Sequence, residues 1–152
     1  MSSQDYKTLE LPANYKPKKS EPYMCPMQLA YFYRILKAQK EEIENSKESV
    51  LNAVRLAEKT DSLGVGDESD NATFNQDITM DLRMYDRNNK LLQKIDVALT
   101  RIENSTNPDM ELSKKYGYSV VSGDEIGIQR MMARPLATMT VDEQEEYEAH
   151  KN

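Results

Sequence analysis

Acidic residues cluster in the middle of the sequence, around a short glycine-containing segment. Six carboxylates and no Lys or Arg occur between residues 61 and 81: Asp61, Asp67, Glu68, Asp70, Asp77 and Asp81. Carboxylates at this density are suited to meet a metal ion or cationic side chains of a partner. Because turns favour Asp and Gly in any case, a simple solvated turn is the alternative interpretation.

Basic residues follow this acidic stretch, at Arg83, Arg87, Lys90, Lys94 and Arg101. Arg and Lys donate charge-assisted hydrogen bonds to anionic groups, so these residues are candidates for binding an anion. Arg87 and Lys94 are seven residues apart, which places them on one face of a helix. They could equally be solvated charges beside a coiled-coil seam.

Other residue types give little basis for catalysis. Cys25 and His150, the one Cys and the one His, form no nucleophile–base pair or metal cluster, so we expect no enzyme activity. A net charge of −6 and a pI near 4.9 argue against DNA binding, which needs a basic face. No apolar run approaches the ~20 residues of a membrane span, and the first residues lack an apolar signal core. A lone cysteine agrees with a reducing cytoplasm, where we expect the protein.

Two stretches with seven-residue periodicity must position these charges. The first is helical from Pro26 for roughly 35 residues, with a stripe at Leu29, Leu36, Ile43, Val50 and Ala57 flanked by Phe32 and Ala53. The second runs from about residue 71 to 103, with Ile78, Tyr85, Leu92 and Leu99 flanked by Leu82, Ile95 and Ile102. Because a short turn at 64–67 joins them, they can bury their stripes on each other. The sequence therefore predicts an antiparallel coiled-coil hairpin over 23–103, with its tip at 64–72.

The rest of the chain has no long seven-residue repeat. The predicted fold class of the whole chain is mainly α. Residues 1–22 contain three prolines and predict an extended N-terminal arm. Residues 104–139 predict a small globular module with a brief hairpin, packed through Tyr116, Tyr118, Val120, Val121, Ile126, Ile128 and Met131. The capping-box pattern at Thr140 to Glu143 predicts a C-terminal helix over 140–152.

Several ordered motifs resemble one known family. They are Tyr23-Met24 with Gln28-Leu29-Ala30-x-Phe32-x-Arg34-Ile35-Leu36, Asp67-x-x-Asp70-x-Ala72, Asp81-Leu82-Arg83-x-x-Asp86-Arg87, Lys90-Leu91-x-x-Lys94-Ile95, Tyr116-Gly117-Tyr118, Gly123-x-Glu125-Ile126-Gly127-Ile128-x-Arg130 and Ala133-Arg134-Pro135. Together they cover about residues 23–150 with the spacing of the DksA/TraR family of RNA polymerase-binding transcription factors. The loop at 103–115 looks longer than in the family's type member.

This resemblance implies a function. Such proteins bind RNA polymerase at its secondary channel and insert the hairpin toward the active centre. They destabilise promoter open complexes, lowering ribosomal RNA transcription in the stringent response together with ppGpp. The implied tip residues are Asp67, Asp70 and Ala72. The implied ppGpp-binding residues are Arg87, Leu91, Lys94 and Arg134. Gln144 replaces a basic residue expected in the last helix. The implied partner is polymerase core or holoenzyme, with no sequence-specific DNA or membrane, and the protein is expected to be a monomer.

The resemblance also implies a departure from the family's four-cysteine zinc site. Here the corresponding positions are Ser119, Ser122, Thr140 and Glu143, none of which is a thiol. A structural zinc ion is held by four Cys or His ligands. We therefore expect no bound zinc, and we expect Thr140 and Glu143 to cap a helix instead.

Two other functions remain open at this point. A Gre-like transcript-cleavage factor also places acids at a coiled-coil tip, where they hold a second Mg²⁺. A coiled-coil adaptor outside transcription explains the heptads, but it explains neither the acidic tip nor the basic stem.

Overall fold

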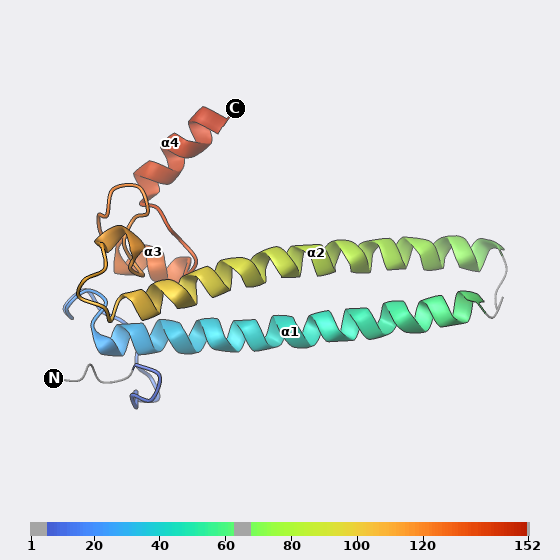
Figure 1. The fold of residues 1–152 in the computed structure, drawn as a ribbon, viewed down its shortest axis with the longest axis horizontal. Helices are drawn as coiled ribbons and strands as arrows, with labels where there is room; N and C mark the ends of the chain where they lie inside the picture. The colour runs from blue at the N-terminus through green and yellow to red at the C-terminus, as the bar shows by residue number, and fades with distance from the viewer. Residues whose placement is uncertain (1–5, 63–67, 152) are drawn as a thin grey trace. The chain divides into compact units, whose positions relative to one another are not determined.

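Helices dominate the computed structural model, which describes residues 6–62 and 68–151 (Figure 1). In chain order they are α1 (Pro26–Ser62), α2 (Glu68–Asn104), the 3-10 helix η1 (Leu112–Lys114), α3 (Ile128–Ala133) and α4 (Val141–Lys151). The described residues contain no strand, and their β structure is an isolated antiparallel bridge between Tyr118 and Glu125. Within these ranges, no helix combines the length and apolarity needed to cross a membrane.

Helix α1 begins at Pro26, as predicted. Proline suits the first helical position because its missing N–H is not needed there. Gln28 supports this start from inside the protein. Its fully buried side chain accepts a hydrogen bond from the Met24 N–H at 2.8 Å and donates one to the Lys18 carbonyl at 3.2 Å. The residues before the helix are thereby fastened to its first turn.

The start of α2 differs from the prediction, because the helix begins at Glu68 rather than near residue 71. Acidic and Ser residues are favourable in a first helical turn, where they face the positive end of the helix dipole. The acidic stretch therefore supports helix rather than turn from Glu68 onward. The predicted tip at 64–72 overlaps this first turn, and residues 63–67 lie outside the described part of the chain.

The chain divides into two compact units, and both long helices contribute to each. One, here called the two-helix unit, is Gln39–Gln93. The other, here called the mixed unit, contains the described residues up to Ala38 and from Lys94 onward. Within the two-helix unit, α1 and α2 run antiparallel and side by side, as the hairpin prediction requires (Figure 1).

The two-helix unit has a thin core. Ile43 is buried, whereas Val50, Ile78 and Tyr85 are half-buried. The Lys47 ammonium group lies 5.1 Å from the centre of the Tyr85 ring, which is within the range of a cation–π contact. Two helices can bury only the stripe between them, which explains why so polar a sequence still forms this unit.

Four residues predicted to pack are exposed, and one of them is Ala53, expected beside the seam of α1. Leu82, expected beside the seam, is 45% exposed, and Val120 and Val121, expected in the module core, are 46% and 68% exposed. Leu82 lies off the stripe that faces α1, since two helices shield no more than that stripe. Val120 and Val121 lie on a surface turn between Ser119 and Ser122, where no element covers them.

The mixed unit contains most of the buried apolar side chains. Phe32 of α1 packs on Tyr116 with ring centres 5.4 Å apart, which joins the helix pair to the residues that follow it. Met131 of α3 is fully buried in the same unit. The other buried apolar residues of this unit are Tyr6, Met24, Leu29, Ala30, Leu36, Ile95, Ala98, Ile102, Ile126 and Ile128.

The predicted extended N-terminal arm is wrong for the described residues. Residues 6–25 form successive turns that fold onto the first turns of α1. The Tyr6 ring is buried and contacts Tyr33 edge to face at 5.2 Å, and Tyr15 contacts Tyr31 in the same way at 6.1 Å. Aromatic rings remove large apolar areas from water, so they hold a polar, proline-rich segment in place.

Candidate functional site

The predicted tip residues are placed only in part. Asp67 lies outside the described residues. Asp70 and Ala72 fall within the first turns of α2 by backbone, and their side chains lie outside the description. Asp77, the next acid along α2, is exposed to solvent. Of the acidic stretch, Glu68, Asp70, Asp77 and Asp81 therefore belong to α2, whereas Asp61 belongs to the end of α1.

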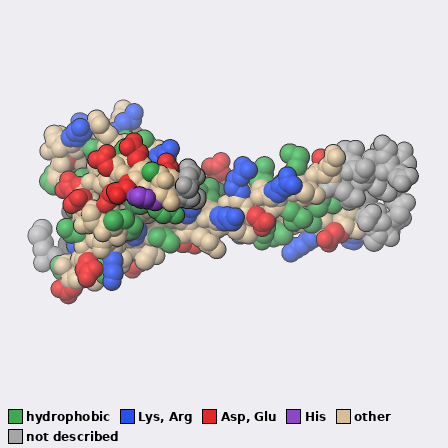
Figure 2. All heavy atoms as spheres, turned by 90° about the horizontal axis from the view of Figure 1, so that it is seen from above, with side chains coloured by type: hydrophobic (Ala, Val, Ile, Leu, Met, Phe, Trp, Pro, Cys, Tyr) green, Lys and Arg blue, Asp and Glu red, His purple; other side chains and the backbone are tan. Residues whose placement is uncertain are grey.

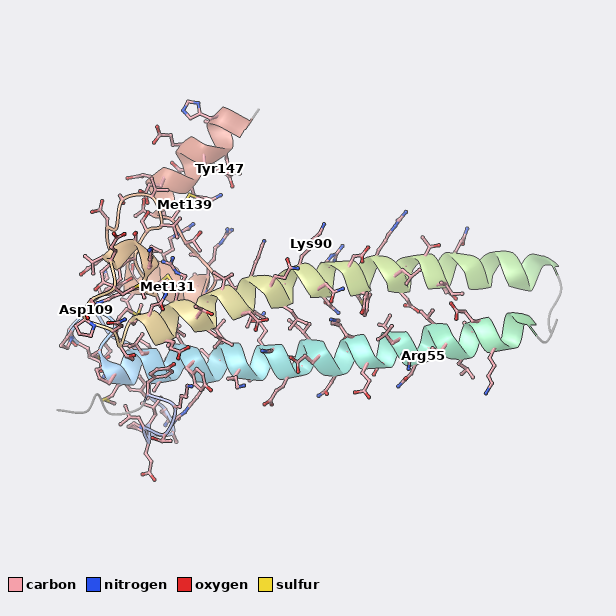
Figure 3. All side chains as sticks on the ribbon, in the orientation of Figure 1. Arg55, Lys90, Asp109, Met131, Met139 and Tyr147 are labelled. Carbon is pink, nitrogen blue, oxygen red and sulfur yellow. The ribbon has the colours of Figure 1, made fainter. Side chains whose placement is uncertain are left out.

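The predicted anion-binding residues on α2 share one exposed face of a continuous helix. Arg87 and Lys94 are exposed, and Leu91 between them is half-buried. Arg83 and Lys90 lie on the same face, since the spacings 83, 87, 90 and 94 follow the helical repeat. Lys90 extends from the side of α2 that faces away from α1 (Figure 3). Figure 2 shows Lys and Arg side chains at the surface of the two-helix unit.

Arg101 is not exposed like the preceding Arg and Lys residues of α2, although its position in the sequence suggests that it would be. It is 7% exposed and donates hydrogen bonds to the carbonyls of Ser113, Lys115 and Tyr118. Burial lowers the pKa of this guanidinium. Arg101 therefore fastens the segment after α2 onto the helix, a role that its type and spacing do not indicate.

Arg134, the fourth predicted anion-binding residue, follows α3 and is exposed. Its own N–H bonds the Arg130 carbonyl at 2.7 Å. The backbone that follows is held at two points, where the Tyr116 hydroxyl donates to the Pro135 carbonyl at 2.7 Å and Arg130 Nε donates to the Met139 carbonyl at 3.2 Å. The guanidinium thus projects from a fixed segment. Arg87 and Leu91 belong to the two-helix unit, whereas Lys94 and Arg134 belong to the mixed unit.

Tyr23 belongs to the first family-like motif, but the sequence alone indicates no role for its side chain. Its hydroxyl donates to the Gly117 carbonyl at 2.6 Å and accepts from the Gly127 N–H at 3.0 Å. Its ring meets that of Tyr118 edge to face at 5.5 Å. Gly117 has φ +86°, and a Cβ there would lie 2.7 Å from Met24 Cε, so the close approach requires glycine.

The four positions that correspond to zinc ligands lie close together in the mixed unit. Thr140 and Glu143 form the predicted capping box: the Thr140 N–H donates to Glu143 Oε1 at 2.9 Å, and the Glu143 N–H donates to Thr140 Oγ1 at 3.2 Å. Hydrogen bonds from Ser119, first, and then from the Thr140 backbone and Ser122 lower the pKa of Glu143 to about 2.

Comparison with known proteins decides the family. Residues 28–102 match the family described as DnaK suppressor protein DksA, N-terminal domain. The RNA polymerase-binding transcription factor DksA of Caulobacter vibrioides (strain NA1000 / CB15N) is 39% identical over 137 residues, which cover 90% of this chain and 87% of the relative. The chain belongs to the DksA family. The family resemblance and the mainly helical hairpin fold predicted from the sequence are confirmed.

Other DksA proteins agree with this assignment. The RNA polymerase-binding transcription factor DksA of Escherichia coli (strain K12) is 30% identical over 128 residues, which cover 84% of this chain and 76% of the relative. A solved structure, titled as transcription factor DksA2 from Pseudomonas aeruginosa, superposes with a TM-score of 0.70 at 29% identity. That match covers 90% of this chain and 93% of the other.

The donor set of this DksA-family member does not fit a structural zinc ion. Three of the four positions carry hydroxyls, which are not the thiolate or imidazole ligands of structural zinc, and the fourth is a carboxylate already engaged in hydrogen bonds. In the described part of the chain, no group of three or more His, Cys, Asp or Glu side chains is placed to hold a metal ion.

Proposed function

We propose that this chain binds RNA polymerase and regulates transcription from within its secondary channel. The observation that carries the proposal is family membership over most of the chain, with relatives that are named for binding RNA polymerase. In this role the α1–α2 hairpin enters the channel, and its acidic end acts near the active centre to destabilise promoter open complexes. Ribosomal RNA promoters are the expected targets.

In this proposal the acidic end is needed for the effect on transcription and is not needed for binding to polymerase. Asp67, Asp70 and Ala72 are the residues expected to act there, because carboxylates interact with cationic side chains or a metal ion in a partner. Asp70→Asn removes one charge while keeping the side-chain shape. We expect this variant to bind polymerase normally and to lose most inhibition of a ribosomal RNA promoter in vitro.

Asp77→Asn is the matched control, since Asp77 is an exposed acid on the same helix. It should inhibit transcription like the wild type. Equal inhibition by both variants would contradict the role of Asp70. If purified protein instead stimulated cleavage of a stalled transcript, a Gre-like function would be supported.

The basic residues give the proposal a second part, in which ppGpp is the co-regulator. Arg87, Lys94 and Arg134 would donate charge-assisted hydrogen bonds to the phosphates, and Leu91 would pack beside the nucleotide. Arg87 and Lys94 are exposed, as such contacts require. Gln144 stands where a further basic residue is expected, so the response to ppGpp should be weaker than in relatives that have it.

Arg87→Ala tests this part, with Arg83→Ala as the control on the same exposed face. One charged hydrogen bond contributes about 1.5–3 kcal/mol, so Arg87→Ala should weaken ppGpp-dependent inhibition by roughly tenfold or more. Inhibition without ppGpp should persist. An equal response of both variants to ppGpp would contradict the assignment.

Regulation is proposed to need no zinc. Thr140 and Glu143 support this, because at two of the corresponding positions they bond each other as a helix cap. A cell with a zinc-containing relative could then use this chain when zinc is scarce. Transcription assays in the presence of a chelator test the point directly.

A further inference from the structure

Residues 134–139, here called the Arg134 segment, lie between α3 and α4 and are not helical. Hydrogen bonds nevertheless hold the backbone of this segment. The Arg134 N–H bonds the Arg130 carbonyl at 2.7 Å, and the Arg134 carbonyl accepts the Ala137 N–H at 3.0 Å. Arg134 therefore has a fixed backbone on both sides, although neither helix includes it.

Two side chains fasten the same segment. The Tyr116 hydroxyl donates to the Pro135 carbonyl at 2.7 Å, directly after Arg134. Arg130 Nε donates to the Met139 carbonyl at 3.2 Å, so Arg130 bonds the segment at both ends, through its own carbonyl and through its side chain. Without such contacts, a connection of this length would keep much of its conformational entropy and would sample many backbone conformations.

Tyr116 is itself held firmly in the mixed unit. It is 2% exposed, and its ring packs on Phe32 of α1 with centres 5.4 Å apart. The Tyr116 N–H bonds the Arg101 carbonyl at 3.1 Å and Ser105 Oγ at 3.0 Å, where α2 ends. Tyr116 therefore links the Arg134 segment to both long helices within this unit.

This fixed segment presents a single charge to solvent. Arg134 is the one charged residue between 131 and 141, and it is exposed. A cation on a fixed backbone loses less conformational freedom when it binds an anion, which favours affinity. We infer that Tyr116 and Arg130 are positioning residues for Arg134 and that they set how strongly the protein responds to ppGpp. This role rests on the proposed function, in which the Arg134 guanidinium donates hydrogen bonds to the phosphates.

Tyr116→Phe tests this role, because it removes the hydroxyl and keeps the ring on Phe32. With polymerase saturated by the variant, the ppGpp concentration for half-maximal inhibition of a ribosomal RNA promoter should rise about three- to tenfold, the range for one neutral hydrogen bond. Tyr15→Phe is the matched control, since the Tyr15 hydroxyl bonds Glu21, outside the Arg134 segment. The control should respond like the wild type, and equal responses of the two variants would overturn the inference.

A combined variant shows whether Tyr116 acts through Arg134. Arg134→Ala should weaken the response to ppGpp, and adding Tyr116→Phe should cause no further loss, because the guanidinium that Tyr116 positions is absent. Additive losses would show that Tyr116 acts by another route and would overturn the inference alone. A wild-type response of Arg134→Ala would instead contradict the binding role of Arg134 in the proposed function, and the positioning role with it.

Amide exchange tests the positioning without polymerase or ppGpp. In Tyr116→Phe the N–H groups of Arg134 and Ala137 should exchange faster than in the wild type. The Leu29 N–H, which bonds the Cys25 carbonyl in the same unit, should exchange at its wild-type rate. Equally faster exchange at all three sites would indicate a general loss of stability and would contradict the local role.

Arg130→Met covers the case in which Tyr116→Phe does not fold. It removes the hydrogen bond to the Met139 carbonyl at a half-buried position. We expect the same weaker response to ppGpp and the same lack of additivity with Arg134→Ala. A folded Arg130→Met variant that responds to ppGpp like the wild type would overturn the inference.

Discussion

Removing one oxygen atom, in Tyr23→Phe, tests how the segment before α1 holds the mixed unit together. The Tyr23 hydroxyl bridges the Gly117 carbonyl and the Gly127 N–H, at 2.6 and 3.0 Å. The substitution keeps the ring, and with it the edge-to-face contact with Tyr118. The change therefore isolates the two hydrogen bonds from the packing of the aromatic ring.

The expected loss of stability follows from the polar group that loses its hydrogen-bond partner. The buried Gly117 carbonyl keeps the hydrogen bond from the Ile126 N–H at 2.9 Å, so the Gly127 N–H is the group that loses its partner. An unsatisfied buried group costs about 1–3 kcal/mol, so the free energy of unfolding should fall by about 1–3 kcal/mol. For a chain of this length, that corresponds to a decrease in melting temperature of roughly 2–12 °C.

Circular dichroism at 222 nm during heating measures this change. Tyr147→Phe is the control, because Tyr147 is 55% exposed and should melt like the wild type. A Tyr23→Phe variant that melts within a degree of the wild type would refute the proposed bridge.

Tyr23 also leads us to expect a loss of stability at alkaline pH. Burial raises the pKa of Tyr23 to about 12 from an ordinary value of 10.0. Because the folded protein favours the protonated phenol, the stabilisation from Tyr23 is present below pH 10 and is lost as the pH rises from 10 to 12. Stability should therefore fall less steeply over this range in Tyr23→Phe than in the wild type.

Three further predictions follow. Val50→Pro, in the interior of α1, should cost about 3 kcal/mol and reduce both the helical signal and transcriptional inhibition; full inhibition would show that an intact α1 is not needed. Arg101→Met should lower the free energy of unfolding by about 3 kcal/mol, because three backbone carbonyls lose the charged donor that joins them to α2; denaturant titration against Arg83→Met, at an exposed site, measures this, and equal midpoints would contradict it. Purified protein should contain no stoichiometric zinc and should melt identically with and without EDTA; one tightly held equivalent by elemental analysis would contradict the claim.

The helical seam is predictable from the sequence because it depends on local periodicity. The seven-residue spacing locates Leu29, Leu36 and Ile43, all of which are buried. Pro26 and the capping box at Thr140 mark helix starts by well-defined local chemistry, and both are found where expected. The start of α2 is less predictable, since acids and Ser suit both a turn and a first helical turn.

Long-range contacts explain what the sequence does not reveal. Arg101 has the same type and nearly the same spacing as the exposed Arg and Lys residues of α2, yet it is buried against carbonyls that come 12 to 17 residues later. Tyr6 and Tyr15 meet tyrosines of α1 that are distant in sequence. Val120 has the apolar character of a core residue but lies on an exposed turn.

The candidate site shows the same division. The motif that includes Ser119 and Ser122 identifies the departure from cysteine, and the capping pattern identifies the hydrogen bonds between Thr140 and Glu143. The hydrogen bond from the Val120 N–H to the Thr138 carbonyl, which joins the two segments, depends on the fold, and no local pattern predicts it.

The central claim, that this chain binds RNA polymerase without zinc, is tested most directly by a binding measurement. The wild-type protein, treated with a chelator and verified to contain no zinc, is mixed with core RNA polymerase and analysed by sedimentation. We predict that it moves with polymerase at one copy per enzyme and that the Asp70→Asn variant binds equally well. A chelator-treated protein that stays folded, as judged by circular dichroism, but sediments separately from polymerase would contradict the account.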